Sequence, residues 1–510
     1  MVTLNLFDNV PNFDGLRKNI ASGITDKKFI ELELARWLTS KERARQINAE
    51  RYYEGKQDIL ARKRRVIGED GKLVSVDNLP NNRIVDNQYA KMVDQKANYL
   101  LGKPLTFDVE NDAYGKALRA VFSPKVQRQF RLAAEKAIIG GKCFIMPYYN
   151  NNGQFSFELF PVHEILPFWA NTAHTELDCA VHFFQVYEYK NDGTEKITDK
   201  AEIFHAGGIE RFIWENGTLI YDNDAPSGSY ITVSDGNATQ KSYNWERLPL
   251  ICFKRNHSET PLLNSVKCLQ DAYNLILSDF VNGMEENVHN SVLVLHNYDG
   301  ENLGEFRRNL ATYGAVKVRS VDGVNGDVDT LEITVNAENY KTVMKLLKEA
   351  IVENARGYDA KDERLSGTPN QMNIQSMYSD IDLDANGMET EFQAAFEDLL
   401  FFVNAHLANT GAGIFTGEPV KVIFNRDILI NESEAIDNCG KSQGIISKET
   451  IVKQHPWVDD PIQELERIEA EKEAEAAEAD AYRAAFENFT GGNRQNTPSG
   501  NSPEGGALNE

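Results

Sequence analysis

Cysteine is scarce in this sequence and does not occur in closely spaced pairs. An odd number of scattered cysteines excludes a disulfide framework, and the lack of a C-x-x-C motif gives no sign of a zinc site. We therefore expect free thiols in a reducing compartment, most of them acting as small buried apolar residues. The five are Cys143, Cys179, Cys252, Cys268 and Cys439.

Long hydrophobic runs are also missing. No apolar stretch approaches the roughly 18 residues that a bilayer crossing needs. The strongest candidate, residues 399–403, is short and lies in a helical pattern. The N-terminus carries Asp8, Asp14 and Arg17 and has no apolar core of a secretion signal. We therefore expect no membrane partner.

Positive charge is in short supply. Lysine and arginine number 54 against 77 aspartate and glutamate, which gives a formal net charge of −23. A protein that grips nucleic acid through its phosphates usually has a basic surface, so the composition argues against tight binding. One local exception is the basic cluster at residues 62–65, which is either a solvated helix end or a contact to an acidic partner.

Catalytic and cofactor-binding motifs are absent too. The nine histidines form no H-E-x-x-H motif, and there is no G-x-S-x-G motif. Residues 435–442 end like a phosphate-binding loop, but Ala435 stands where the first glycine is needed. Asp459 and Asp460 lie between two prolines and suit a turn and helix start better than an acid–base pair. We expect no enzyme, no metal and no cofactor, and interpret the chain as an assembly component.

One acidic motif leaves an alternative open. Four carboxylates have the spacing of a calcium-binding loop, but Ala385 occupies the position where the sharp turn of such a loop needs glycine. The preferred interpretation is a helix with carboxylates on its surface, and a cation is the alternative. The residues are Asp380, Asp382, Asp384 and Glu391.

The most informative stretch runs from residue 261 to residue 367. Apolar residues recur every three or four positions over 262–288, which predicts a helix about 40 Å long. A compact β-containing region follows at 289–336, with strands predicted at 291–296, 315–318 and 328–335, and a second helix is predicted over 337–357. Two such helices would lie antiparallel and would be too thin to bury their own apolar faces. Either the rest of the chain or other copies of it must cover them.

The remaining sequence predicts an α+β fold. Helices are expected at 26–54, 81–102, 114–122 and 127–139, and a strand is expected at 105–109. Short alternating strands from 142 to 253 predict a largely antiparallel sheet. A long helix, a strand and three further helices are expected at 374–409, 418–425, 433–444, 447–455 and 462–489. The tail 490–510 is rich in Gly, Ser, Asn and Pro and is expected to be disordered.

Several stretches, taken in order, carry a resemblance to a known family. They are Tyr-Tyr-Glu-Gly-Lys-Gln-Asp-Ile at 52–59 with 62–65, then 82–107, 295–302 with 327–331, and 447–469. Together they resemble the portal proteins of tailed bacteriophages, in the branch found in long-tailed phages of Gram-positive bacteria. The resemblance covers about residues 50–480, although the segment 359–373 has only Gly367 where a glycine-rich run is expected.

This resemblance implies a ring of about twelve copies at one capsid vertex, through which double-stranded DNA is packaged and ejected. The implied partners are the terminase large subunit, a head-completion adaptor, and the major capsid and scaffolding proteins. The implied location is the virion, after assembly in the host cytoplasm. The implied parts are a wing at 1–255 with 410–445 returning to it, stem helices at 256–288 and 337–358, a clip at 289–336, a tunnel loop at 359–373, a long wing helix at 374–409, a crown at 446–489 and a disordered tail at 490–510.

The candidate site residues follow from this assignment. Lys341, Lys345 and Lys348 recur at i, i+4 and i+7 on the second long helix, where they form either a solvated face or weak phosphate contacts lining the channel. Lys361 and Arg364 are candidate DNA contacts in the tunnel loop. The clip candidates for binding the connector or terminase are Asn297, Tyr298, Asp299, Glu301 and Glu305.

The acidic composition suits such a channel, because a mostly acidic wall repels the duplex and keeps it mobile, whereas many phosphate contacts would hold it. Two other classes remain as alternatives: a head–tail adaptor or other connector protein, and a DNA-packaging nuclease or motor subunit. The enzyme would need carboxylates around Mg²⁺ or a complete phosphate-binding loop, and the sequence shows neither.

Overall fold

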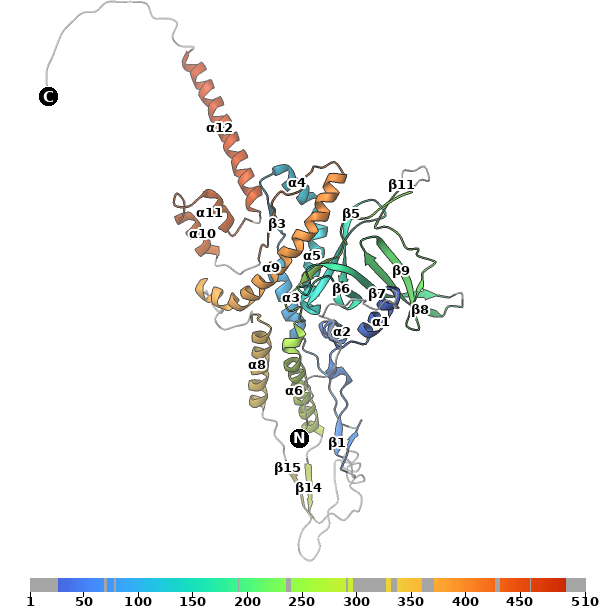
Figure 1. Ribbon diagram of the computed structural model, residues 1–510. Helices are drawn as coiled ribbons and strands as arrows, with labels where there is room; N and C mark the ends of the chain where they lie inside the picture. Colours follow the sequence, from blue (N-terminus) through green and yellow to red (C-terminus); the bar gives the residue numbers. More distant parts are fainter. Residues whose placement is uncertain are drawn as a thin grey trace, which may run out of the picture. The chain divides into compact units, whose positions relative to one another are not determined.

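The computed structural model describes residues 26–67, 71–77, 79–190, 192–234, 240–289, 292–296, 327–331, 337–359, 371–426, 432–458 and 460–491. The chain divides into two compact units (Figure 1). The first comprises Met1–Ser366 and Gln375–Ile428, and the second comprises Gly367–Ile374 and Leu429–Glu510.

The first unit begins with two helices, α1 (Asp26–Leu38) and α2 (Lys41–Tyr53). The prediction of one continuous helix over 26–54 was therefore wrong at residues 39–40, where α1 ends and α2 begins. The backbone of Ser40 is extended, and its side-chain oxygen accepts a hydrogen bond of 3.1 Å from the Arg43 N–H. This is the geometry of an N-cap, which starts a new helix.

The helix predicted from residue 81 begins later, as α3 (Gln88–Leu101). Asn87 caps it by accepting a hydrogen bond of 3.0 Å from the Ala90 N–H. Residues 80–87 have no regular secondary structure. They are instead hydrogen-bonded to side chains of a later helix, as described below.

The next elements lie close to their predicted positions. They are β3 (Thr106–Asp108), α4 (Asp112–Val121) and α5 (Pro124–Gly140). β3 pairs antiparallel with β16 (Lys421–Ile423), so that part of the segment 410–445 returns to the first unit. Helix α10 (Glu432–Lys441), in contrast, belongs to the second unit.

Two antiparallel sheets form the centre of the first unit, as the alternating pattern predicted. The three-stranded sheet has the order β13 (Ile251–Lys254), β4 (Lys142–Tyr149), β5 (Phe155–Pro161). The five-stranded sheet has the order β10 (Thr218–Tyr221), β9 (Gly208–Glu215), β8 (Glu195–His205), β7 (Leu177–Tyr189), β6 (Ile165–Trp169). Smaller hairpins pair β1 (Arg65–Ile67) with β2 (Leu73–Ser75), and β11 (Ile231–Ser234) with β12 (Gln240–Tyr243).

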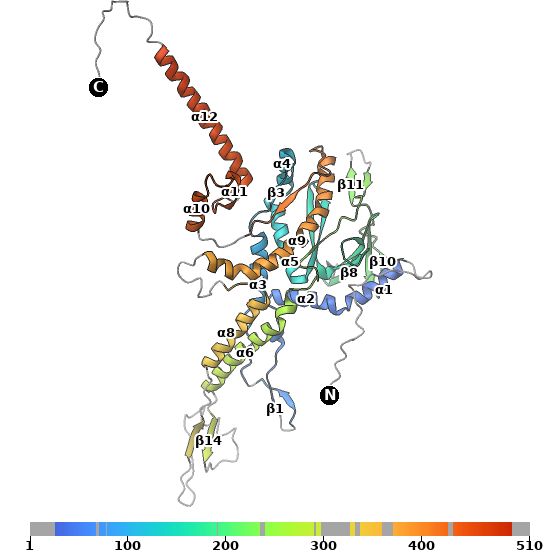
Figure 2. The same ribbon diagram turned by 60° about the vertical axis from the view of Figure 1, so that its left-hand side comes forward.

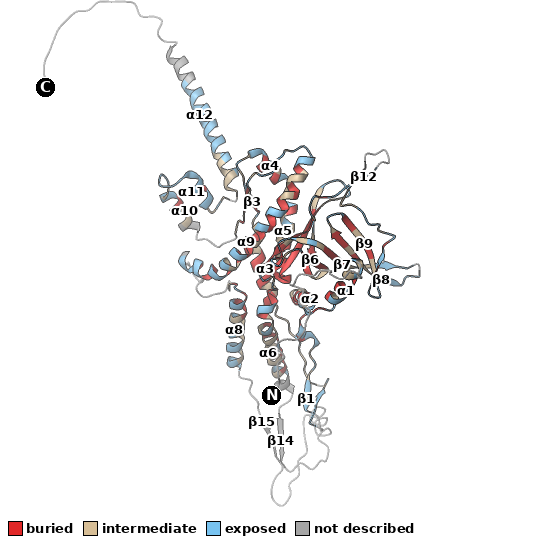
Figure 3. Ribbon diagram, viewed as in Figure 1, coloured by how far each residue is buried: buried red, intermediate tan, exposed pale blue. Residues whose placement is uncertain are grey.

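Aromatic side chains join the smaller sheet to its covering helices. Phe130 of α5 lies 4.9 Å, between ring centroids, from Phe396 of the long helix α9 (Gln371–Asn409). It also contacts Phe157 of β5 and Phe253 of β13. Figure 3 shows the sheets, α3, α5 and the middle of α9 as the buried part of this unit. Burying rings of this size is a major source of folding free energy.

Two helices extend from this core with a pair of strands between them in the sequence. The helices are α6 (Leu263–His289) and α8 (Ala337–Asn354), and the strands β14 (Val292–His296) and β15 (Asp327–Leu331) pair antiparallel. Both predicted long helices and the first predicted strand between them are confirmed. The predicted strand 315–318 lies outside the described residues. Helix α9 begins at Gln371, so the last residues of the predicted loop 359–373 are helical.

The second unit contains α10, α11 (Lys448–Gln454) and α12 (Pro461–Gly491). The Asp460 carboxylate accepts hydrogen bonds from the Ile462 and Gln463 N–H groups, at 3.0 and 3.1 Å, and so caps α12. This confirms the predicted helix start at Asp460. Thr490 and Gly491 continue α12, and residues 492–510 lie outside the described part.

Candidate functional site: the long helices and their attachment

The helices α6 and α8 form the helix pair, which lies side by side in Figures 1 and 2 with β14 and β15 at its far end. The rings of Phe280 on α6 and Tyr340 on α8 lie 5.0 Å apart between centroids and set the register of the pair. Toward the core, Ile351 and Val352 of α8 are buried. Farther out, Val343 and Leu346 remain 40% and 58% exposed. A single subunit therefore leaves part of the apolar surface of α8 exposed to solvent.

Helix α6 has a buried face that is polar rather than apolar. Every fourth residue on this face has a polar side chain that is at most 1% exposed. We call these four residues the polar ladder: Gln270, Asn274, Ser278 and Asn282. The sequence-based interpretation of α6 counted only its apolar positions and missed this face.

The polar ladder binds the backbone of the segment before α3. Three ladder oxygens accept N–H hydrogen bonds from alternate residues of this segment, and a fourth binds the start of α3. The pairs are Asn82 N–H to Asn282 at 2.7 Å, Ile84 N–H to Ser278 at 3.0 Å, Asp86 N–H to Asn274 at 3.1 Å and Tyr89 N–H to Gln270 at 3.0 Å.

The spacing of the ladder has a simple geometric basis. Four residues of α-helix advance by about 6.0 Å, and two residues of extended chain advance by about 6.6 Å. A helix side chain at every fourth position therefore meets every second N–H of an extended segment. Because a buried N–H without a partner costs about 1–3 kcal/mol, the ladder lets this segment lie against α6 without forming a strand.

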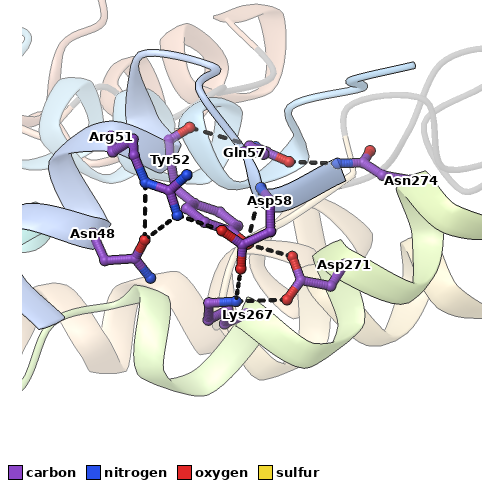
Figure 4. Close-up of polar contacts among 8 residues, drawn as sticks. All are labelled: Asn48, Arg51, Tyr52, Gln57, Asp58, Lys267, Asp271 and Asn274. Atoms are coloured by element: carbon purple, nitrogen blue, oxygen red, sulfur yellow. Dashed lines mark hydrogen bonds and ion pairs between the residues drawn. The ribbon is translucent and has the colours of Figure 1, made fainter. Parts of the chain in front are cut away.

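A second polar cluster, the junction, attaches α2 and residues 57–58 to the start of α6 (Figure 4). The Lys267 ammonium of α6 lies 2.7 Å from the carboxylates of both Asp58 and Asp271. The Tyr52 hydroxyl donates to Asp271 at 2.5 Å, and the side chain of Arg51 is paired with Asp58. The junction thus explains several polar positions in the motif at 52–59.

The junction also shifts the pKa values of its groups. Burial opposes ionisation of Asp58, but hydrogen bonds from Lys267 and Arg51 outweigh it and lower the pKa of Asp58 to about 2. Burial and the hydrogen bond to Asp271 raise the pKa of Tyr52. At neutral pH, Asp58 is therefore charged and Tyr52 is a neutral hydrogen-bond donor.

The turn that leads into α6 is fixed by a buried ion cluster around Glu259. Its carboxylate pairs with Lys142, and it lies 2.9 Å from the Lys254 ammonium and 2.8 Å from His174 Nδ1. Gly141 allows this close packing, because it has φ of +90° and an added Cβ would lie 2.1 Å from the Glu259 carbonyl oxygen. Burial opposes ionisation of Glu259, but the two lysines lower its pKa to about 2.

The three candidate lysines lie on one flank of α8, but they differ in their surroundings. Lys341 is exposed, and Lys345 is exposed with Glu349 at 3.8 Å. Lys348 is half-buried, and its ammonium lies 3.0 Å from the Asp359 carboxylate. Lys341 and Lys345 are therefore the better candidates for a passing ligand, whereas Lys348 also fixes the chain after α8.

The side chains of α8 fall on three sides of the helix. Tyr340, whose ring contacts Phe280 of α6, marks the side that faces α6. At about 100° per residue, the lysines lie about 80–140° from Tyr340 in one direction, and Val343 and Leu346 lie about 60° and 120° from it in the other. The lysine flank and the exposed apolar flank therefore face nearly opposite ways.

The acidic motif of α9 forms ion pairs instead of a calcium loop. Asp384 lies 2.7 Å from the Lys96 ammonium and 3.8 Å from Arg255, and Asp382 pairs with Arg426. Burial lowers the pKa of Lys96 to about 8 even though Asp384 opposes this. In the described ranges, no three His, Cys, Asp or Glu side chains form a group that could hold a metal ion. The predicted helix is confirmed, since Asp380, Asp382, Asp384 and Glu391 all lie in α9, but Asp384 is only 20% exposed.

The other candidate residues lie outside the described part of the chain. These are Lys361 and Arg364 of the loop after α8, and Asn297, Tyr298, Asp299, Glu301 and Glu305 between β14 and β15. Their roles stay predictions. None of the helices in the described ranges has the length and apolarity needed to cross a bilayer.

The similarity to known proteins covers the same elements. The family described as "Phage portal protein, SPP1 Gp6-like" matches residues 39–478, which include the junction, the polar ladder and the helix pair. A chain with this match is a phage portal protein by class. It belongs to the SPP1 Gp6-like family of phage portal proteins, which confirms the predicted resemblance.

Two relatives show how far this similarity extends. The portal protein of Bacillus phage SPP1 is 28% identical over 424 residues, covering 82% of each chain. The portal protein of Clostridium phage phiCD119 is 26% identical over 489 residues, covering 90% of this chain and all of the relative. Two chains from solved structures of a native gene transfer agent particle, its virion and its neck, match with a TM-score of 0.38 each, at 12% and 10% identity, over 71% of this chain and 87% of theirs.

Proposed function

We propose that about twelve copies of this chain form a closed ring at one vertex of a phage capsid, and that double-stranded DNA passes through its centre during packaging and ejection. The terminase large subunit and a head-completion adaptor would dock on the ring. The major capsid and scaffolding proteins would surround it in the virion after assembly in the host cytoplasm. The chain would act as a structural conduit without catalysis.

The observation that carries this proposal is that apolar side chains of the helix pair are exposed in the single subunit. The chain's membership of the portal family supports the same conclusion. Val343 and Leu346 are exposed on α8 in the single subunit, although leucine and valine gain about 1.5–3 kcal/mol when fully buried. Repeating the subunit around an axis would cover such a surface, because head-to-tail contacts whose rotation closes form a ring.

The dimensions agree with a DNA channel. Twelve helices spaced about 10 Å apart would place their axes on a circle about 38 Å across and leave a bore of about 28 Å. A duplex about 20 Å wide would pass through this bore. Lys341 and Lys345 would offer weak, exchangeable contacts to the phosphates, and Lys361 and Arg364 of the tunnel loop would add others.

The proposal can be tested in infected cells whose phage has an interrupted gene for this chain. We expect heads without DNA protected from nuclease, and recovery when a plasmid supplies the wild-type chain. Lys341→Glu/Lys345→Glu should form rings but restore less protected DNA, because two attractive contacts become repulsive. The matched control Lys116→Glu/Lys125→Glu makes the same charge change at exposed positions of α4 and α5 and should restore packaging. Normal packaging without the chain would contradict the proposed function, whereas full recovery with the α8 variant would contradict only the lysine contacts.

A further inference from the structure

The side of α6 that faces away from α8 also exposes aliphatic side chains. Leu275 of α6 is 42% exposed, and so is Leu60, which lies in the segment that runs along α6 between the Asp58–Lys267 and Arg62–Asp279 ion pairs. On the helical wheel, Leu275 lies about 140° from Phe280, which contacts α8. Figures 1 and 2 place α8 and the segment leading to β1 on opposite sides of α6. The helix pair thus has an exposed apolar patch on each side.

The two patches lie at the same height along the helix pair. The contact between Phe280 and Tyr340 sets a common reference level. Leu275 is five residues from Phe280 and Leu346 is six residues from Tyr340, so both lie about 8–9 Å from this level, toward the core. In a ring whose axis runs parallel to the helices, every copy keeps the same height, so the Leu275 side of one copy would meet the Leu346 side of the next.

The exposed charges beside the two patches differ in sign. On the α6 side, the aspartates at i−4 and i+4 from Leu275 are paired, Asp271 with Lys267 and Asp279 with Arg62 and Arg64, and Lys63 and Arg65 are exposed in the segment alongside. On α8, Glu349 and Glu353 are exposed next to Leu346. Exposed ion pairs contribute little to affinity, but complementary charges favour one orientation of the two surfaces over others.

We infer that Leu60 and Leu275 of one copy pack against Val343 and Leu346 of the next, so that the lysine flank of α8 is left to face the bore. This inference rests on the proposed ring and adds which surfaces form its contact. α8 then has three partners on its three sides: α6 of its own chain, the next copy, and the channel. The positions of Lys341 and Lys345 follow from the apolar contact.

Site-specific crosslinking of the full-length chain tests this contact. In a Cys268→Ala background, which removes an exposed thiol, one preparation carries Leu275→Cys and another carries Leu346→Cys. The two are mixed as monomers, assembled and treated with a short bismaleimide. We expect a covalent dimer containing both kinds of chain, and a ladder of larger species when one chain carries both substitutions.

The matched control replaces Leu346→Cys by Lys345→Cys, which lies at nearly the same height on the lysine flank. It should give much less crosslinked dimer. Assembly is checked by electron microscopy before the reagent is added. This inference would be overturned by rings in which Leu275→Cys does not crosslink to Leu346→Cys, or in which it crosslinks more efficiently to Lys345→Cys. Neither result would contradict the proposed ring itself. Chains that never assemble, including the Cys268→Ala parent and the wild type, would overturn the proposed ring as well.

Discussion

At the scale of single residues, the least expected feature is the buried polar face of α6. A hydrophobic pattern predicts the buried side of a helix only when the neighbouring element contacts it through apolar side chains or through backbone groups that already have hydrogen-bond partners. Here the neighbour is the segment 82–88, whose N–H groups need acceptors, so Asn274 and Ser278 occupy positions where apolar residues are usual. The signal in the sequence is a run of short polar residues at i+4 spacing inside an otherwise apolar helix.

Loss of a ladder residue should cost stability. Asn274→Ala leaves the part-buried Asp86 N–H without its acceptor and also removes the hydrogen bonds of Asn274 to Gln57 and Gln270, which we expect to lower the free energy of unfolding by about 1–3 kcal/mol. Asn264→Ala changes an exposed asparagine of the same helix and should shift it by less than about 0.5 kcal/mol. Urea unfolding followed by tryptophan fluorescence measures both. Equal effects of the two substitutions would show that the ladder does not hold the segment.

Glu259 predicts a specific dependence of stability on pH. Its pKa is about 2 in the folded protein and about 4.3 for an unperturbed glutamate, so its charge stabilises the fold fully above the unfolded pKa and less as pH falls toward 2. The difference in unfolding free energy between wild type and Glu259→Gln should therefore be largest above about pH 4.5 and shrink toward pH 2.

The control for this prediction is Glu176→Gln, which changes an exposed glutamate and should give a small difference at every pH. The comparison between variants cancels the titration of the other carboxylates. If the difference for Glu259→Gln stayed constant from pH 6 to pH 2.5, the buried lysines would not hold that carboxylate in its charged form.

At the scale of elements, periodicity predicted most of the fold. The two long helices follow from spacing, since α6 and α8 have apolar residues every three or four positions. The strands follow from short β-forming runs separated by turn residues, such as Asn191–Gly193 between β7 and β8. The errors arose where a single side chain decides the boundary. Ser40 divides the first helix by capping α2, and Asn87 delays α3, because each supplies an acceptor for free N–H groups that apolar spacing does not reveal.

The candidate site was predictable to a similar degree. The spacing of Lys341, Lys345 and Lys348 placed them on one flank of α8, and the structure agrees. Sequence spacing could not show that Lys348 reaches Asp359, or that Asp384 is surrounded by Lys96, Arg255 and Arg356, because those contacts join residues far apart in the chain.

At the scale of the whole molecule, the helix pair is firmly attached to the core of the first unit through α6, whereas part of the surface of α8 is left exposed. The junction, the polar ladder and the Glu259 turn fix α6 to the core of the first unit, whereas α8 contacts its own chain along only part of its surface. A rigid attachment of this kind would let neighbouring copies meet with a constant angle, which is what a closed ring requires. The acidic composition, with a net charge of −23, would then limit how strongly the ring holds DNA.

Electron microscopy of the purified full-length protein tests this claim most directly. The account predicts closed rings of about twelve subunits, with the helix pairs of neighbouring copies side by side around a central hole of about 28 Å, wide enough for a duplex. Isolated subunits, or small assemblies in which α8 is covered without a central hole, would contradict it.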